Sequence, residues 1–343
     1  MKKTASILLI SFLCAFVFSP FLAQAAGEGS ERMPWEMEAL KDDLSHVRGV
    51  TKLKMGWPRT IEYEHQTYDF REDALYQRKR TAVIASKPLR IIPHAVGVTE
   101  ILWAICPRER IIAFHESSAN PEFCFIADLV EKKGPVFQSK QTELIIGYRP
   151  DLVFTVFYSG GPFKAKLRQA KIPYFDLGHF GTLASIKKQT LLIGDLIGEE
   201  GNAQALVSRI DEKIQGLRRK IPDTDKPVRV LCYNEGGYVP GESSSFESIC
   251  HIIGVVNVGV EQGIKSWSQI DYETLLKWDP DIIVVPKRRD IKEQLMANEV
   301  LSHARAIKEG KVYEIPGRYL SVDSQYLVLS ANLLAGIVYE GAF

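Results

Sequence analysis

The stretch R-I-I-P-H-A-V-G-V-T-E-I-L at residues 90–102 decides the fold. Its first residues, Arg90 to Ile92, form a short apolar β-branched run that Pro93 ends, and the residues that follow are helix-like. A buried strand followed at once by a helix is typical of β–α–β units, in which parallel strands are covered by helices on both faces. The stretch therefore predicts an α/β fold.

The same alternation continues after this stretch. Residues 88–181 form a first predicted lobe and residues 223–323 a second one, each Rossmann-like with a mainly parallel sheet, and a ligand cleft lies between them. Residues 324–343 predict a last helix. Strands are predicted at residues 90–92, 110–114, 152–156, 174–177, 228–233, 282–285 and 311–314, and a helix at 245–253.

A single long helix is predicted to join the lobes over residues 182–222. This segment has no proline before Pro222, and its apolar residues recur at spacings of three and four. An unbroken helix of about forty residues would reach ~60 Å, and we expect a stiff connection that bends at Gly198 and Gly201. The apolar series is Leu183, Ile186, Thr190, Ile193, Ile197, Leu206, Ile210, Ile214, Leu217 and Ile221.

The N-terminal residues predict export. Residues 1–25 have the pattern of a cleaved signal peptide: Lys2 and Lys3, an apolar run over residues 5–18, and the ending Ala23-Gln24-Ala25. We therefore expect a periplasmic protein. Residues 26–87 are polar and weakly periodic, so we expect a partly ordered leader there.

Composition limits the possible classes of protein. A chain of 343 residues with 45% apolar and 25% charged residues is ordered and large enough for two lobes. The 43 basic and 42 acidic residues give a net charge of +1, which gives no reason to expect a nucleic-acid partner. The sequence lacks a Walker loop and the motifs G-x-S-x-G, H-E-x-x-H and G-x-G-x-x-G, so we do not expect an enzyme.

Four cysteines remain after the signal peptide: Cys106, Cys124, Cys232 and Cys250. An oxidising compartment permits disulfides, and the pairing local in sequence joins Cys106 to Cys124 and Cys232 to Cys250. Four buried free thiols are the alternative, and the sequence leaves both open.

Residues 90–102 resemble the R-I-V-x-L-x-P-x-x-T-E-I-L opening of the helical-backbone (class III) periplasmic binding proteins of ABC importers, which serve ferric siderophores, haem and cobalamin. Residues 142–153, 275–284 and 306–313 resemble three later motifs of that family in the same order. The resemblance implies a monomer without an intrinsic cofactor that captures a metal chelate and delivers it to an ABC permease in the inner membrane.

The resemblance leaves the ligand open. We expect a ferric siderophore, because the predicted cleft is rich in Arg, Lys, Tyr and His. Cobalamin or haem in the same role is the first alternative. The second is direct binding of a bare transition metal by a scavenger or sensor.

The predicted cleft residues directly follow the strands, because ligands of open parallel sheets bind at the carboxyl ends of the strands. Aromatic rings there can stack on a flat chelate, and arginines can bind its carboxylates. The predicted ligand-binding residues are His94, His115, Glu116, Tyr158 and His179 in the first lobe, and Tyr233, Glu235, Tyr238, Arg288, Arg318 and Tyr319 in the second.

Three of these residues are also candidate metal ligands. His94, His115 and His179 could bind a bare transition metal with Glu116 as a fourth ligand, or they could contact an intact chelate. For docking, members of the resembled family carry a glutamate on each lobe that pairs with permease arginines. Glu143 matches the first position, and we assign the second to Glu247.

Overall fold

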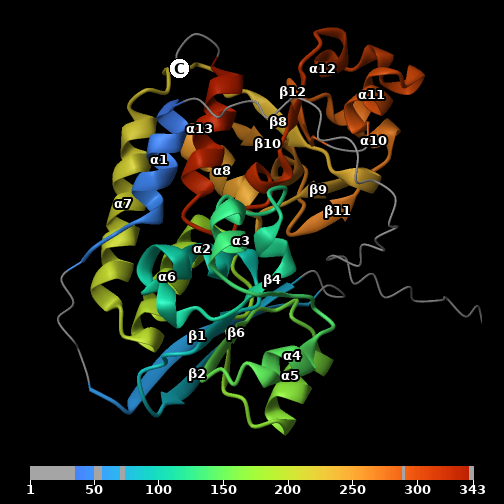
Figure 1. The fold of residues 1–343 in the computed structure, drawn as a ribbon. Coiled ribbons are helices and arrows are strands. Elements are labelled where there is room, and N and C mark those ends of the chain that lie inside the picture. Colours follow the sequence, from blue (N-terminus) through green and yellow to red (C-terminus); the bar gives the residue numbers. More distant parts are fainter. Residues whose placement is uncertain (1–34, 50–55, 70–73, 288–289, 340–343) are drawn as a thin grey trace, which may run out of the picture.

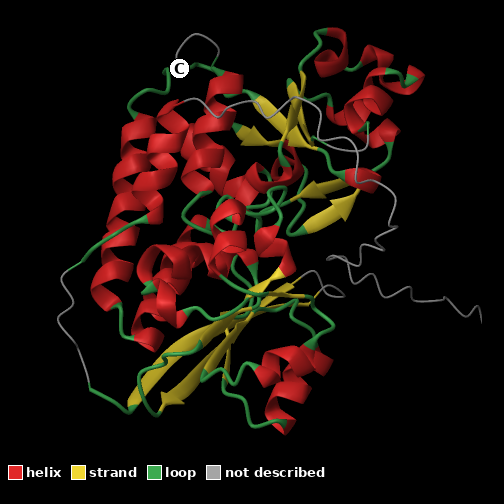
Figure 2. Ribbon diagram, viewed as in Figure 1, coloured by secondary structure: helices red, strands yellow, loops and turns green. Residues whose placement is uncertain are grey.

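The computed structural model describes residues 35–49, 56–69, 74–287 and 290–339. The predicted signal peptide and Arg288 lie outside these residues. Two α/β lobes are present, each with a group of strands surrounded by helices (Figure 2). Within the described ranges, no helix has the length and apolar character needed to cross a membrane.

The first lobe contains a parallel sheet in the order β3-β6-β7, with Ile91 opposite Leu152 and Val153 opposite Tyr174. A parallel bridge between Ile91 and Ile111 connects this sheet to the pair β4-β5. The strands are β3 (Ile91–Pro93), β4 (Phe114–His115), β5 (Val136–Phe137), β6 (Leu152–Thr155) and β7 (Tyr174–Asp176), and the helices are α2 (Val96–Ile105), α3 (Ala127–Lys133), α4 (Thr142–Gly147) and α5 (Gly161–Gln169).

The strand predicted over residues 110–114 is mostly wrong. A 3-10 turn occupies Arg108–Arg110, because the amides of Arg110 and Ile111 donate to the carbonyls of Pro107 and Arg108. Within the predicted range, Ile111 forms a single bridge with Ile91, and a paired strand is present only at Phe114–His115.

The second lobe contains a parallel sheet in the order β10-β8-β12-β13 and a separate antiparallel pair, β9-β11. Its strands are β8 (Arg229–Cys232), β9 (Tyr238–Pro240), β10 (Val256–Asn257), β11 (Trp267–Gln269), β12 (Ile282–Pro286) and β13 (Val312–Ile315). Its helices are α8 (Ser245–Ile253), α9 (Val258–Glu261), α10 (Tyr272–Trp278), α11 (Ile291–Met296) and α12 (Arg305–Lys308), and α13 (Leu327–Val338) is the last helix.

The single helix predicted over residues 182–222 is instead a helical hairpin of α6 (Leu183–Ile197) and α7 (Glu200–Arg218). Gly198 ends α6 in the left-handed conformation, with φ of 73°, so the chain reverses there. Lys187 on α6 pairs with Asp211 on α7 at 2.6 Å, which places the two helices side by side.

The connection between the lobes is therefore α7 alone, whose 19 residues span ~28 Å. It packs against α2 of the first lobe and against α8 and α13, and Figure 1 shows it along one side of the molecule.

The leader predicted over residues 26–87 contains regular elements that pack against the rest of the molecule. Its described parts are α1 (Trp35–Ser45) and the antiparallel pair β1 (Arg59–Asp69) and β2 (Ala74–Ile84). Helix α1 packs against α2, α7 and α13, and β1 packs against α6. Leu44 and Ile61 of the leader belong to a buried apolar cluster that also includes residues of both lobes.

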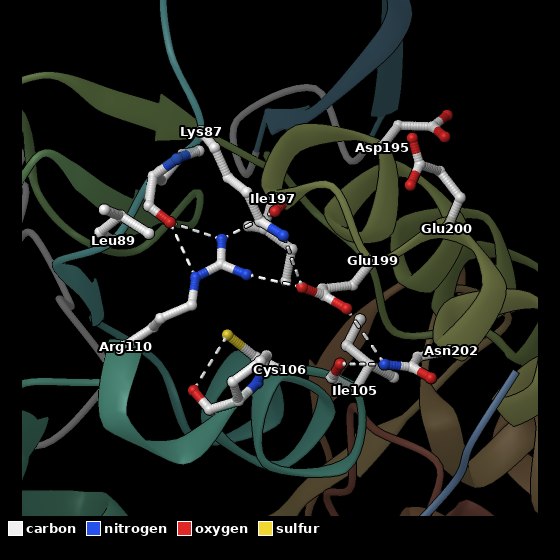
Figure 3. Close-up of polar contacts among 12 residues, drawn as sticks. Lys87, Leu89, Ile105, Cys106, Arg110, Asp195, Ile197, Glu199, Glu200 and Asn202 are labelled. Atoms are coloured by element: carbon white, nitrogen blue, oxygen red, sulfur yellow. Dashed lines mark hydrogen bonds and ion pairs between the residues drawn. The ribbon is translucent and has the colours of Figure 1, made fainter. Parts of the chain in front are cut away.

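A buried ion pair holds the corner between α6 and α7 (Figure 3). Arg110 Nη1 lies 2.7 Å from Glu199 Oε1, and both side chains are buried. Arg110 Nη2 also donates to the carbonyl of Ile197 at 2.7 Å, and Arg110 Nε to that of Pro88 at 2.8 Å. One guanidinium thus neutralises the acid that precedes α7 and satisfies a carbonyl at the end of α6.

A second buried arginine, from the leader, binds the same corner. Arg59 Nη1 lies 2.6 Å from Glu200 Oε1 and donates to the carbonyl of Asp195 at 2.6 Å. Its guanidinium also lies over the ring of Trp57, 4.4 Å from the centroid. The leader is therefore fixed to the helix that joins the lobes.

The four cysteines are buried free thiols. Burial raises the pKa of Cys106 and Cys232 to about 12. Of the two alternatives open from the sequence, the structure has free thiols and not disulfides.

Arg110→Leu should lower the free energy of unfolding by about 3 kcal/mol, because it removes the buried cation that neutralises Glu199 and leaves only Lys87, which is more exposed and lies 3.2 Å from Glu199 Oε1. Urea unfolding at pH 7 measures the change. Lys187→Gln, which removes the more exposed ion pair of the same hairpin, is the matched control and should cost about 1 kcal/mol or less. Equal effects of the two substitutions would contradict the role assigned to the buried pair.

Candidate functional site

The carboxyl ends of the first-lobe strands bring predicted residues into two clusters. His94 follows β3 and His115 ends β4, and their ring centroids lie 5.0 Å apart. Phe157 follows β6 and lies between Tyr158 and His179, with centroids 5.0 Å and 4.9 Å away. We call Phe157, Tyr158 and His179 the aromatic cluster.

His94 is buried and neutral. Its ring stacks on Phe163 with centroids 4.2 Å apart, and Nδ1 lies 3.1 Å from the hydroxyl of Ser159. That hydroxyl accepts a hydrogen bond from the amide of Val156. Nε2 is buried without a hydrogen-bond partner. Burial lowers the pKa of His94 to about 3, so the ring is uncharged at neutral pH.

His115 uses both of its ring nitrogens within the first lobe. Nδ1 accepts from the amide of Ser117 at 3.2 Å, and Nε2 lies 2.6 Å from the hydroxyl of Ser139. Because Nδ1 accepts, Nε2 carries the proton. Burial lowers the pKa of His115 to about 4. The ring therefore has no lone pair available to a metal.

The predicted bare-metal site is not assembled. In the part of the chain that the structure describes, no three His, Cys, Asp or Glu side chains are grouped so that they could hold a metal ion. His179 lies in the aromatic cluster and not with His94 and His115, and Glu116 is half-buried in the turn Glu116–Ala119.

The second lobe places its predicted residues in different environments. Tyr233 is buried in the core of that lobe, where it stacks on Tyr272 with centroids 6.5 Å apart and its pKa is raised to about 12 by burial. It does not stand at the surface that we expected to face the first lobe. Glu235 and Tyr238 are half-buried at the turn Glu235–Gly237 and at the start of β9.

Arg318 and Tyr319 connect the lobes. Arg318 Nη1 donates to the carbonyl of Pro121 at 2.7 Å, and its guanidinium lies 5.6 Å from the ring centroid of Phe125. Tyr319 is buried and meets the edge of Phe125 at 4.8 Å. Both predicted ligand residues thus make contacts between second-lobe and first-lobe segments.

A buried carboxylate at the lobe junction was missed. Glu100 on α2 accepts from the amide of Phe125 at 2.7 Å and from the hydroxyl of Ser324 at 2.5 Å, and its backbone carbonyl accepts from Gln325. Burial raises the pKa of Glu100 to about 7. An acid within the apolar series of residues 96–105 was the signal that could have identified it.

A second buried acid at the junction is Asp323, which directly precedes Ser324. A side chain at Gly97 would lie 2.2 Å from the Asp323 carbonyl, so only glycine permits this close approach. Burial raises the pKa of the Asp323 carboxyl to about 7. Helix α2 and the segment before α13 are therefore in direct backbone contact.

The two predicted docking glutamates differ in accessibility. Glu143 on α4 is exposed and pairs with Lys166 at 2.8 Å, which lowers its pKa. Glu247 in the first turn of α8 is half-buried, and burial raises its pKa. Of the pair, Glu143 presents the more accessible carboxylate.

Comparison with known proteins defines the class to which these two lobes belong. The family model described as Periplasmic binding protein matches residues 98–319, from α2 to the interlobe contact of Tyr319. The chain belongs to this periplasmic binding protein family.

Individual relatives are distant in sequence. A cobalamin-binding protein of Halobacterium salinarum is 20% identical over 244 residues, which cover 71% of this chain and 65% of that protein. The ferric-anguibactin-binding protein FatB of Vibrio anguillarum is 23% identical over 211 residues, 58% of this chain and 64% of that protein. The chain thus spans less than two thirds of the length of these relatives.

Solved structures share the fold. The periplasmic heme-binding protein RhuT from Roseiflexus sp. RS-1 superposes with a TM-score of 0.64 at 18% identity, over 74% of this chain and 99% of that one. This agreement supports the two-lobed α/β architecture described above.

The two buried histidines should make the protein sensitive to acid. Their folded-state pKa values of about 3 and about 4 lie below the ~6.5 of an unfolded chain, so the unfolded state takes up protons first as the pH falls. Each histidine should therefore cost about 2 kcal/mol of stability between pH 6.5 and pH 5.

Urea unfolding of His94→Gln at pH 7 and pH 5 checks this expectation. The variant should lose less stability than the wild type over that interval, whatever its stability at pH 7. If the free energy of unfolding falls by the same amount between pH 7 and pH 5 in the variant and in the wild type, His94 does not remain neutral in the folded protein.

Proposed function

We propose that this chain is the substrate-binding component of an ABC importer, which captures a metal chelate between its lobes and delivers it to a membrane permease. The observation that carries the proposal is the match of the family to residues 98–319, which extend across both lobes. A ferric siderophore is the favoured ligand, and cobalamin and haem are the alternatives.

The aromatic cluster supports an organic chelate as the ligand. Phe157, Tyr158 and His179 follow β6 and β7 at the sheet edge where ligands of parallel sheets bind. Burial lowers the pKa of His179, which favours a neutral ring that can stack or accept a hydrogen bond. The relatives named above bind cobalamin and ferric anguibactin, which are both chelates of a metal by an organic molecule.

Two further observations support binding over catalysis and a periplasmic location. The relatives are named as binding proteins, which supports a role without chemistry on the ligand. The signal-peptide pattern of residues 1–25 supports export to the periplasm, as the family name suggests.

Docking to the permease is assigned first to Glu143. Its carboxylate is exposed on α4 of the first lobe, and the side chain of Lys166, with which it pairs, is 50% exposed. Pairs of this kind are weak, so a permease arginine could replace the lysine at little cost. Glu247 is the candidate on the second lobe, although burial makes it less available.

A thermal-shift panel tests the proposal. The mature protein is mixed with ferric siderophores, cyanocobalamin, haemin, Fe³⁺, Zn²⁺ and Ni²⁺. A chelate at ~100 times its dissociation constant should add about 2.7 kcal/mol and raise the melting temperature by a few degrees. Stabilisation by a bare metal alone would contradict the chelate proposal and support a scavenger or sensor.

An uptake experiment tests the docking role of Glu143. Uptake of the chelate that stabilises the protein is measured in cells that produce either the wild type or Glu143→Lys. The variant should bind the chelate with unchanged affinity and support little uptake. Wild-type uptake by the variant would show that Glu143 does not dock the permease.

A further inference from the structure

The leader hairpin formed by β1 and β2 reaches the edge of the first-lobe sheet. Its strands pair in one register over their whole length, from Arg59 opposite Ile84 to Asp69 opposite Ala74. In Figure 1 both strands run obliquely across the first lobe. The described residues at the far end of the hairpin are 66–69 and 74–77.

Backbone contacts fix the hairpin relative to β7. Gln66 forms a parallel bridge with Gly178, and the amide of His179 donates to the Gln66 carbonyl at 2.7 Å. Because β7 ends at Asp176, residues after Gln66 continue beyond the carboxyl end of β7. Ligands of parallel sheets bind beyond this end.

Both faces of β1 contact neighbouring elements. Glu64 on one face forms an ion pair with Lys188 of α6, and the opposite face carries Tyr63 and His65. Tyr63 packs against Phe175 of β7 with centroids 4.6 Å apart, and His65 Nε2 lies 3.4 Å from Asp176. Thr67 is the next residue on this face, because side chains alternate along a strand. Its hydroxyl lies 3.2 Å from His65 Nδ1, which agrees with that placement.

The same face of β2 carries Tyr76 and Arg78, which pair with Thr67 and His65. Tyr76 is 43% exposed, and Arg78 is exposed as well. An aromatic ring and a positive charge thus stand on the same face of the hairpin as Tyr63 and His65, on the strand that β1 separates from the segment of Gly178. Leu75 is 45% exposed on the opposite face.

We propose that Tyr76, with Thr67 and Arg78, forms one wall of the chelate site and selects an anionic chelate that contains aromatic rings. The inference rests on the proposed function. The ring of Tyr76 extends the aromatic cluster and stacks on a ring of the ligand, and the guanidinium of Arg78 attracts its negative charge. The ferric complex of a tris-catecholate siderophore has both properties.

The test compares two ferric complexes, one of a tris-catecholate and one of a neutral tris-hydroxamate without aromatic rings. Calorimetry gives the affinity of the full mature chain, its Tyr76→Ala and Tyr76→Phe variants, and Leu75→Ala as the matched control. Tyr76→Ala should weaken tris-catecholate binding by about threefold to tenfold, whereas Tyr76→Phe and Leu75→Ala should bind like the wild type. Melting temperatures verify that each variant is folded.

Three results would overturn the inference. Wild-type affinity of Tyr76→Ala, or equal weakening by Leu75→Ala, would remove Tyr76 from the site and leave the proposed function intact. A wild type that binds only the hydroxamate complex would contradict the selection for an anionic aromatic chelate, again without affecting the import role. A wild type that binds no chelate at all would overturn both the inference and the proposed function.

Discussion

The buried pair between Arg110 and Glu199 is the interaction on which the rest of the structure depends. An unpaired charge in this position would be costly, so the guanidinium must meet the carboxylate at the corner between α6 and α7. That corner receives Arg59 from the leader as well. One small cluster therefore fixes the helix that joins the lobes, the first lobe and the leader in a single arrangement.

This arrangement limits how the lobes can move. Helix α7 packs on both sides of the junction, and further contacts cross it, among them those of Glu100 with Ser324 and of Arg318 with Pro121. A rigid helix with buried polar contacts permits small rotations and opposes a wide hinge movement. Ligand capture should therefore depend on a site that is already shaped in the free protein, with the leader hairpin as a part of its wall.

The sequence predicted the two lobes and most of the strands of their main parallel sheets, because buried parallel strands are short β-branched runs with turns at their ends. It did not predict the reversal at Gly198, since a helical series continues on both sides of that glycine and the periodicity alone cannot show a left-handed residue. Tyr233 and Glu100 show the same limit for the site. Tyr233 directly follows a strand, but its position in the sequence does not show that its side chain turns toward the core. Glu100 is an acid, but its charge in the sequence does not show that the side chain is buried.

Small-angle scattering of the mature protein with and without a saturating chelate tests the central claim most directly, which is that a clamped α7 joins the lobes stiffly. A compact chain of this size has a radius of gyration of about 20 Å. The account predicts nearly superimposable profiles and almost the same radius for the free and bound forms. A clear compaction on binding would contradict it, because that result requires the lobes to rotate about the corner that Arg110 and Glu199 hold.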